Sequence, residues 1–313
     1  MFAYIVRRVL ATIPVMGVVA LFVFSLLYLS PGDPAAIIAG DTATVEDIAR
    51  IRAQLGLDRP FLVQFGTWLW SVLHGDLGIS IFTNLPVTRL IEQRLEPTVA
   101  LTVCTLLVTV VVAIPLGVVA AWKAGTWIDR AVMIFAVLGF SVPVFVIAYL
   151  LIFGISIGLD LLPVQGYTSI REGFWPFLRN MILPSAALGM VYIALVARIT
   201  RASMLDVLAQ DYIRTAQAKG LATREVLIGH ALKNAAVPIA TIIGIGIALL
   251  ISGVVVTETV FAIPGIGRLT VDAILRRDYP IIQGVILLFS AAYVLVNLAV
   301  DISYTVLDPR VRY

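Results

Sequence analysis

The sequence holds few side chains of the kinds that do chemistry, and their spacing gives no known catalytic arrangement. Its histidines are His74 and His230, and its one cysteine is Cys104. The chain has no Gly-x-x-x-x-Gly-Lys-Ser/Thr phosphate loop, no His-Glu-x-x-His zinc motif and no cysteine pair. We interpret the histidines as surface or packed side chains and Cys104 as a buried small hydrophobe. We therefore expect no catalytic, cofactor-binding or metal-binding residues, and no enzyme activity in this chain alone.

Two acidic residues, Glu258 and Asp301, lie in apolar segments, both near the segment ends. Carboxylates are costly at the centre of a bilayer and less costly near its boundary. Glu258 is therefore interpreted in one of two ways. It is a tolerated interfacial residue, or it forms an ion pair with Arg268, beyond a Pro-Gly turn, that closes the outer end of the spans as a gate.

A polar stretch between two apolar segments runs from Asp211 to Pro238. Asp211 is suited to cap a helix that ends at Lys219, Gly220 suits the left-handed position after it, and Thr223 is suited to cap a second helix. Basic residues along this stretch hold it at a water-facing surface. Such a helix-turn-helix is either an ordinary amphipathic loop or a docking element for another protein.

The composition places these residues in a membrane protein. The 313-residue chain is 60% hydrophobic and 13% charged, and its mean hydropathy is +1.02, values far from those of soluble proteins. The net charge of +3 comes from basic residues spread along the loops. This spread suits membrane topology better than nucleic-acid binding, so no nucleic-acid partner is expected.

Apolar runs predict an all-α membrane protein with six transmembrane helices, separated by polar segments. The predicted spans are about 9–29, 98–122, 131–159, 181–199, 237–261 and 281–307. The first run is about 31 Å long as a helix, which is too long for the core of a signal peptide. Residues 30–96 are expected to form an external helical segment, and residues 200–236 a cytoplasmic loop. Pro115 with Gly117 in the second span, and Gly139 with Ser141 and Pro143 in the third, are expected to interrupt the helices, as either packing kinks or bends that line a path.

The distribution of basic residues predicts the orientation. Short loops on the side of the termini hold Arg7, Arg8, Lys123, Arg130, Arg198, Arg201, Arg214, Lys219, Arg224, Lys233, Arg310 and Arg312. The short loops opposite hold Arg171, Arg179, Arg268, Arg276 and Arg277. By the positive-inside rule, both termini and the 200–236 loop are cytoplasmic.

Several motifs along the chain resemble one family. They are PGDP at Pro31–Pro34, QLGLDRP at Gln54–Pro60, GDLGIS at Gly75–Ser80, IPGIGRL at Ile263–Leu269, RRDYP at Arg276–Pro280 and LDPRVRY at Leu307–Tyr313. The chain resembles the B-type permease subunit of dipeptide, oligopeptide and nickel importers, which are binding-protein-dependent ATP-binding-cassette (ABC) transporters. The run from Asp211 to Gly220 resembles the EAA loop of these permeases, although Thr215, Ala216 and Gln217 stand at the usual EAA triplet.

The resemblance implies a type I ABC importer permease fold in a bacterial-type inner membrane. It implies as partners a second homologous permease, two cytoplasmic ATP-binding subunits and an extracytoplasmic substrate-binding protein, besides membrane lipid. ATP and Mg would be bound by the partner ATPases and not by this chain. The residues implied in ATPase coupling are Asp211, Tyr212, Arg214, Thr215, Ala216, Ala218, Lys219 and Gly220.

Short peptides are the leading cargo class by this resemblance, and the particular cargo stays open among dipeptides, oligopeptides, glutathione and nickel chelates. The alternative function is a self-sufficient secondary transporter or channel, with a structural membrane scaffold as a third interpretation. Ion coupling favours ionisable residues deep in the bilayer, and Glu258 and Asp301 lie near span ends, which argues against the alternative.

Overall fold

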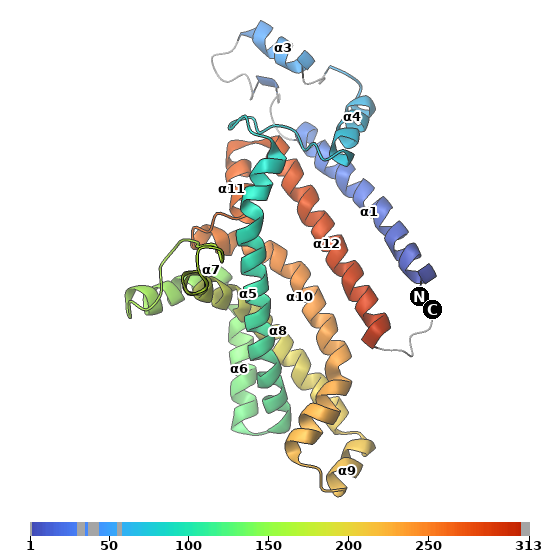
Figure 1. Cartoon of the computed structure of the whole chain (residues 1–313), viewed down its shortest axis with the longest axis vertical. Helices are drawn as coiled ribbons and strands as arrows, with labels where there is room; N and C mark the ends of the chain where they lie inside the picture. Colours follow the sequence, from blue (N-terminus) through green and yellow to red (C-terminus); the bar gives the residue numbers. More distant parts are fainter. Residues whose placement is uncertain (1, 30–34, 37–43, 55–57, 308–313) are drawn as a thin grey trace. The chain divides into compact units, whose positions relative to one another are not determined.

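A computed structural model describes residues 2–29, 35–36, 44–54 and 58–307, and its regular elements are helices (Figure 1). In this part of the chain the one β-type pairing is an isolated bridge between Ile79 and Pro86. The all-α prediction is therefore confirmed. The chain divides into two compact units. Unit 1 comprises residues 95–268 and the chain from 295 onward, and unit 2 comprises residues 2–94 and 269–294.

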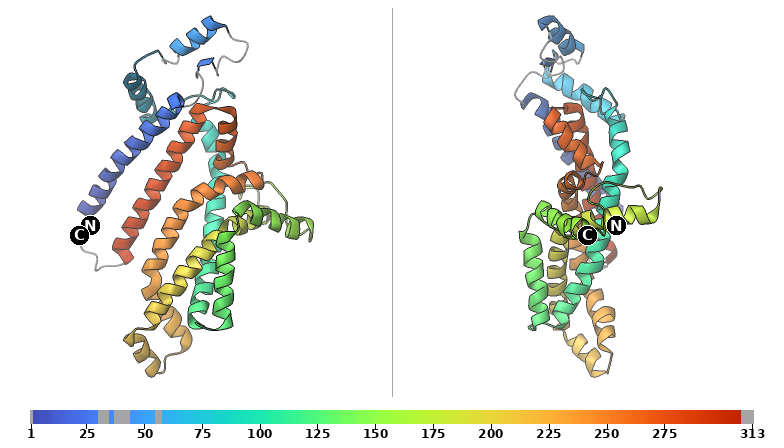
Figure 2. Two further views of the ribbon diagram at one scale, coloured as in Figure 1. Left: turned by 180° about the vertical axis from the view of Figure 1, so that it is seen from behind. Right: turned by 90° about the vertical axis from the view of Figure 1, so that its left-hand side faces the viewer.

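Unit 1 is built from long apolar helices around a central one. Its elements are most of α5 (Val87–Trp122), α6 (Trp127–Ser141), α7 (Val144–Leu151), the π-helical η1 (Ile152–Ile157), α8 (Phe174–Leu208), α9 (Asp211–Ala218), the π-helical η2 (Glu225–Leu232) and α10 (Lys233–Val260). Helix α8 is the centre: 61% of its most apolar window is buried, against 22% for the span Glu225–Ile247, which includes the first half of α10. It packs against α6, α7 and α10, as both views in Figure 2 show.

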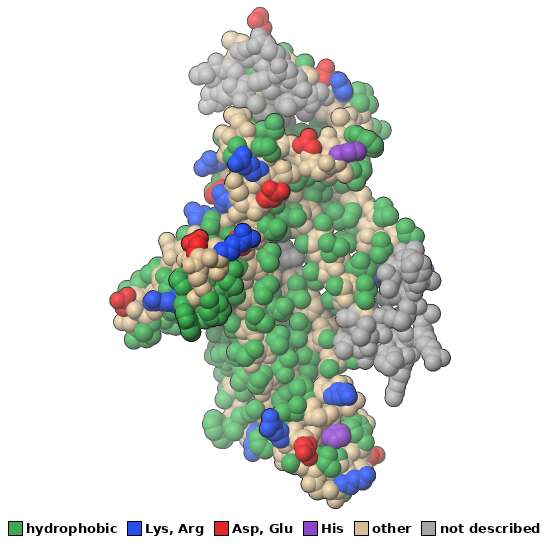
Figure 3. All heavy atoms as spheres, in the orientation of Figure 1, with side chains coloured by type: hydrophobic (Ala, Val, Ile, Leu, Met, Phe, Trp, Pro, Cys, Tyr) green, Lys and Arg blue, Asp and Glu red, His purple; other side chains and the backbone are tan. Residues whose placement is uncertain are grey.

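The core of unit 1 gathers large apolar side chains from helices far apart in sequence. Leu101, Met181, Leu188, Leu250 and Phe261 are all buried in one cluster. Elsewhere in the unit apolar side chains face outward, and Figure 3 shows a nearly continuous apolar flank over α5 and α6, with charged side chains gathered at the lower end near α9. Apolar side chains can face the hydrocarbon of a bilayer. The backbone of each helix is also suited to it, because a helix satisfies its own backbone hydrogen bonds.

The predicted third span, 131–159, is divided in two. Helices α6 and α7 with η1 meet at an angle of 107°, and α7 lies across α6 in Figure 1. Pro143 causes the break: it disfavours helical geometry at the residue before it, and Val142 is extended (φ −91°, ψ 127°). Among the described residues, five helices are long and apolar enough to cross a membrane, and the bent pair makes a sixth if it counts as one span.

Two helices extend well beyond the predicted spans. Helix α5 begins at Val87, not near 98, and has 36 residues, whereas α8 has 35 residues. At a rise of 1.5 Å per residue, each is over about 50 Å long, compared with about 30 Å for the hydrocarbon core. Both helices therefore reach beyond a bilayer. The predicted 200–236 loop shrinks accordingly, because α8 runs to Leu208.

Unit 2 packs its N-terminal helix, α1 (Phe2–Leu29), against α4 (Phe61–Leu73) and α12 (Tyr279–Leu307). The ring of Phe24 lies against Phe61, Phe65 and Trp68, and Val23 is fully buried. The aromatic stripe of α4 thus packs on its own protein. Within unit 2 are also α3 (Val45–Gln54) and most of α11 (Ile266–Arg276).

Two motifs far apart in sequence meet inside unit 2. The hydroxyl of Ser80, in GDLGIS, donates to Oδ2 of Asp278, in RRDYP, at 2.6 Å, and the N–H of Ile81 donates to Oδ1 at 3.3 Å. Both Ser80 and Asp278 are buried. A buried carboxylate needs such donors, so this contact explains why both motifs carry a polar residue at these positions.

Candidate functional site

The polar stretch after α8 contains the short helix α9 and a turn, much as predicted. Gly220 has a φ of +81°, which confirms the left-handed position after the helix. The predicted cap is wrong: Asp211 is the first helical residue, and Gln210 precedes it without a side-chain capping bond. Asp211 instead lies 3.5 Å from Arg214 in an exposed ion pair.

The second helix of this stretch begins at Thr223 and does not stop before the membrane-spanning part. It runs through η2 directly into α10, which contains Pro238. The backbone is thus continuous from the turn at Gly220 to the end of α10, apart from the widened π-helical turns. Movement of the turn would therefore act on α10 through an unbroken helix.

One side chain fixes α9 to the rest of unit 1. Ile213 is fully buried and packs in a cluster with Met204 of α8 and with Val226 and Leu227 of η2. Tyr212 is 44% exposed. Of the predicted coupling residues, Ala216 is half-buried and the others are exposed: Asp211, Tyr212, Arg214, Thr215, Ala218, Lys219 and Gly220. Helix α9 therefore has one anchored face and one face open to another protein.

A hollow beside α9 contains residues that sequence reasoning missed. It is lined by Leu221, Arg224, Glu225, Ile228, Gly229 and His230. Ile228 is 52% exposed there. No motif in the sequence marks this hollow as a site.

The second candidate site is the carboxylate of Glu258, which is fully buried near the end of α10. Its Oε1 accepts a hydrogen bond from the Thr98 hydroxyl of α5 at 2.5 Å. Its Oε2 accepts one from the backbone N–H of Arg268 at 3.0 Å. The Thr98 hydroxyl itself accepts from the N–H of Ile266 at 2.8 Å. Glu258 and Thr98 together hold the first turn of α11.

The glycines of the IPGIG motif make room for this carboxylate. A Cβ on Gly265 would collide with the carboxyl group of Glu258, and a Cβ on Gly267 would come within 2.6 Å of Cα of Val255. Only glycine lets the backbone approach so closely. Gly265 and Gly267 of the motif, together with Thr98 of α5, therefore surround the carboxylate of Glu258.

This arrangement differs from both sequence interpretations of Glu258. The side chain is fully buried, and the backbone N–H of Arg268 donates to its carboxylate, a contact that neither interpretation included. Thr98 was missed because it lies 160 residues away from Glu258 in the chain. The side chain of Asp301 lies outside the described residues.

The loop that contains Tyr167 and Ser169 is hydrogen-bonded to α5 and to the residue after α10, both in unit 1. The hydroxyls of Ser169 and Tyr167 donate to Oε1 of Glu96 on α5, at 2.5 and 3.1 Å. The N–H of Gly166 donates to the carbonyl of Phe261, just after α10, at 2.9 Å. Burial and the bond to Glu96 raise the pKa of Tyr167, so its hydroxyl stays a donor at neutral pH.

The described part of the chain has no group of three His, Cys, Asp or Glu side chains placed to hold a metal ion. The fold and both sites define a multi-pass helical membrane protein. Helix α9 is exposed on one face, and a buried polar contact lies at the end of a span.

Comparison with known proteins gives the family. Residues 113–313 match the family described as the inner membrane component of binding-protein-dependent transport systems, and residues 1–102 match the N-terminal part of such membrane components. The chain belongs to this family. It is a multi-pass inner membrane permease subunit of an ABC importer, not a self-sufficient transporter.

Two similar permeases match along nearly their whole lengths. A probable peptide ABC transporter permease of Sinorhizobium fredii is 56% identical over 310 residues, which cover 99% of both chains. The dipeptide transport permease DppB of Escherichia coli K12 is 40% identical, covering 100% of this chain and 99% of DppB. A solved structure of the methionine ABC transporter MetNI, in an inward-facing conformation, has a TM-score of 0.58 at 16% identity, over 70% of this chain and 96% of that one. That likeness shows the type I importer permease fold alone.

Proposed function

We propose that this chain forms half of the translocation path of an ATP-driven importer of short peptides. The full-length identity to peptide and dipeptide permeases supports this cargo class. The other half of the path would come from a second homologous permease. Two cytoplasmic ATP-binding subunits would hydrolyse ATP with Mg, and an extracytoplasmic binding protein would deliver the peptide.

The open face of α9 is the single observation that supports coupling to an ATPase in this chain. A buried anchor at Ile213 and exposed neighbours make α9 a rigid knob. Docked into a groove of an ATPase, the knob would move when ATP binding closes the ATPase pair. The helices of unit 1 would then reorient, and the path would face outward.

Specificity would reside mainly in the binding protein. A path for peptides of varied side chains works best with few fixed charges, because a strong site would retain some substrates. The buried contact of Glu258 fits this scheme as a gate, because the end of α10, α5 and the start of α11 meet there and separation of these elements would break it.

The cargo is tested with the complete complex in proteoliposomes. We expect the purified binding protein to retain short peptides and labelled dipeptide uptake to require both ATP and that binding protein. Unlabelled dipeptides should compete with the label, whereas a sugar or an inorganic anion should not. Exclusive retention of a sugar or an anion would disprove the peptide assignment, and uptake without any ATP-binding subunit would disprove the importer function.

The orientation predicts which single cysteines react from each side. With Cys104 replaced by Ala, a Thr223→Cys variant is expected to react only after the membrane is made permeable, because the turn before η2 is cytoplasmic. A Glu46→Cys variant in α3 should react in intact cells. Both positions are exposed. Labelling of both variants from the same side would contradict the proposed topology.

A further inference from the structure

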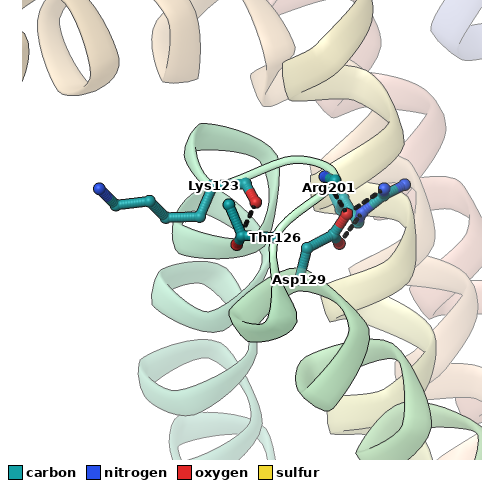
Figure 4. Close-up of polar contacts among 5 residues, drawn as sticks. Lys123, Thr126, Asp129 and Arg201 are labelled. Carbon is teal, nitrogen blue, oxygen red and sulfur yellow. Dashed lines mark hydrogen bonds and ion pairs between the residues drawn. The ribbon is translucent and has the colours of Figure 1, made fainter.

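A bidentate ion pair joins α6 to α8 in unit 1 (Figure 4). Nε of Arg201 lies 2.5 Å from Oδ1 of Asp129, and Nη2 lies 2.7 Å from Oδ2. Asp129 is buried, with 4% of its surface exposed. Paired contacts of this kind fix orientation as well as distance, because the planar guanidinium matches the carboxylate.

The same carboxylate also holds the turn between α5 and α6. The N–H of Gly125 donates to Oδ2 of Asp129 at 3.0 Å, and Gly125 has a φ of +79°. The Thr126 hydroxyl donates to the Lys123 carbonyl at 2.6 Å across this turn. Asp129 therefore ties three pieces of chain together: α6, the α5–α6 turn and α8.

Close backbone packing continues this attachment along the helices. A Cβ on Gly117 of α5 would come within 2.7 Å of the Ala197 carbonyl oxygen of α8. A Cβ on Gly139 of α6 would lie 3.2 Å from the Met190 carbonyl oxygen of α8. These contacts leave little room between the helices, so α5, α6 and α8 would move as one body while the ion pair keeps them in register.

Helix α8 connects Arg201 of the ion pair to α9. The helix has no glycine or proline between Met190 and its end at Leu208, and α9 begins three residues later at Asp211. Met204, one turn after Arg201, is fully buried and packs in the cluster with Ile213 of α9. A displacement of α9 would therefore be passed to α8 through the cluster that contains Ile213 and Met204.

We propose that the Asp129–Arg201 ion pair is a positioning element for transport, which makes α6 and the α5–α6 turn follow α8 when an ATPase moves α9. This proposal rests on the proposed function of the chain as an importer permease. Stability alone gives a weak reason for the pair, because the desolvation of the buried Asp129 and the half-buried Arg201 offsets much of their attraction. Holding two helices in register is what the bidentate geometry adds.

The test compares transport per ATP hydrolysed in the complete complex. The double variant Asp129→Asn with Arg201→Met removes both charges and keeps an oxygen that can accept from the Gly125 N–H. We expect it to assemble and hydrolyse ATP but to transport about fivefold less peptide per ATP, the lower end of typical coupling between sites. Arg201→Lys keeps the positive charge but cannot form the bidentate contact. Its transport per ATP should lie between that of the double variant and that of wild type.

Arg198→Met is the matched control, since Arg198 is an exposed arginine on the same helix. We expect it to leave transport per ATP unchanged. A wild-type ratio in the double variant, or an equal fall in Arg198→Met, would overturn the proposal. Should the double variant fail to assemble, a wild-type ratio in Arg201→Lys would overturn it equally. Absence of ATP-dependent uptake by the wild-type complex would instead disprove the proposed function.

Discussion

Glu258→Gln is expected to raise basal ATP hydrolysis of the purified complex by about tenfold in the absence of binding protein. The glutamine amide keeps one acceptor oxygen, so it satisfies either Thr98 or the N–H of Arg268, but not both as the carboxylate does. A hydrogen bond to a charged group contributes on the order of 1.5 kcal/mol, which corresponds to about a factor of ten in an equilibrium. If the closed gate depends on this contact, the variant opens more often.

The control for this prediction is Glu172→Gln, which removes one negative charge from an exposed loop position. Its basal hydrolysis should equal that of wild type. Glu258→Ala should be more severe, because it leaves two donors without the carboxylate in a buried site, at about 1–3 kcal/mol for each, and a lower yield of complex is expected. An unchanged basal rate in a well-assembled Glu258→Gln complex would restrict Glu258 to holding the first turn of α11.

Gly220→Val is expected to separate ATP hydrolysis from transport while leaving the protein in the membrane. A Cβ at this position meets no atom within 4 Å, so the substitution is not blocked by crowding. The cost is conformational: the φ of +81° is unfavourable for an L-residue by roughly 1–2 kcal/mol, and a β-branched side chain adds to that strain. The turn would relax, and α9 would point in a different direction.

Gly220→Asn provides a sharp control, because asparagine tolerates the left-handed region far better than valine does. It adds a side chain at the same open position and should keep transport near the wild-type level. We expect Gly220→Val to keep most of its ATP hydrolysis and to lose most peptide uptake in proteoliposomes. Full uptake by Gly220→Val would show that the direction of α9 does not matter for coupling.

The two predictions act at opposite ends of one helix. The turn at Gly220 leads through Thr223 and η2 into α10, and Glu258 lies near the end of α10. A variant at Gly220 weakens the coupling of the ATPase to α10, whereas a variant at Glu258 weakens the contact that keeps the path closed. Transport per ATP and basal hydrolysis therefore report on different ends, and the two effects should be separable in the double variant.

Local patterns in the sequence determined much of the helical architecture. Long apolar runs require helices in a bilayer, because each backbone polar group must be satisfied within its own segment. A glycine after a short polar helix marks a left-handed residue, and Gly220 has that conformation. Pro143 marks a break, and the helix does break there, whereas the interruption predicted at Pro115 is wrong, because α5 continues through that residue. Each of these signals depends on residues within a turn or two of one another.

The tertiary structure alone decided which side chains meet. Glu258 and Thr98 are separated by 160 residues, Ser80 and Asp278 by 198, and Asp129 and Arg201 by 72. A threonine or an aspartate carries no local sign of its distant partner, because the partner depends on which helices pack together and at what register. The angle of 107° between α6 and α7 is likewise set by packing: proline removes the regular helix at Val142, but contacts with α8 and α10 determine the direction in which the chain continues.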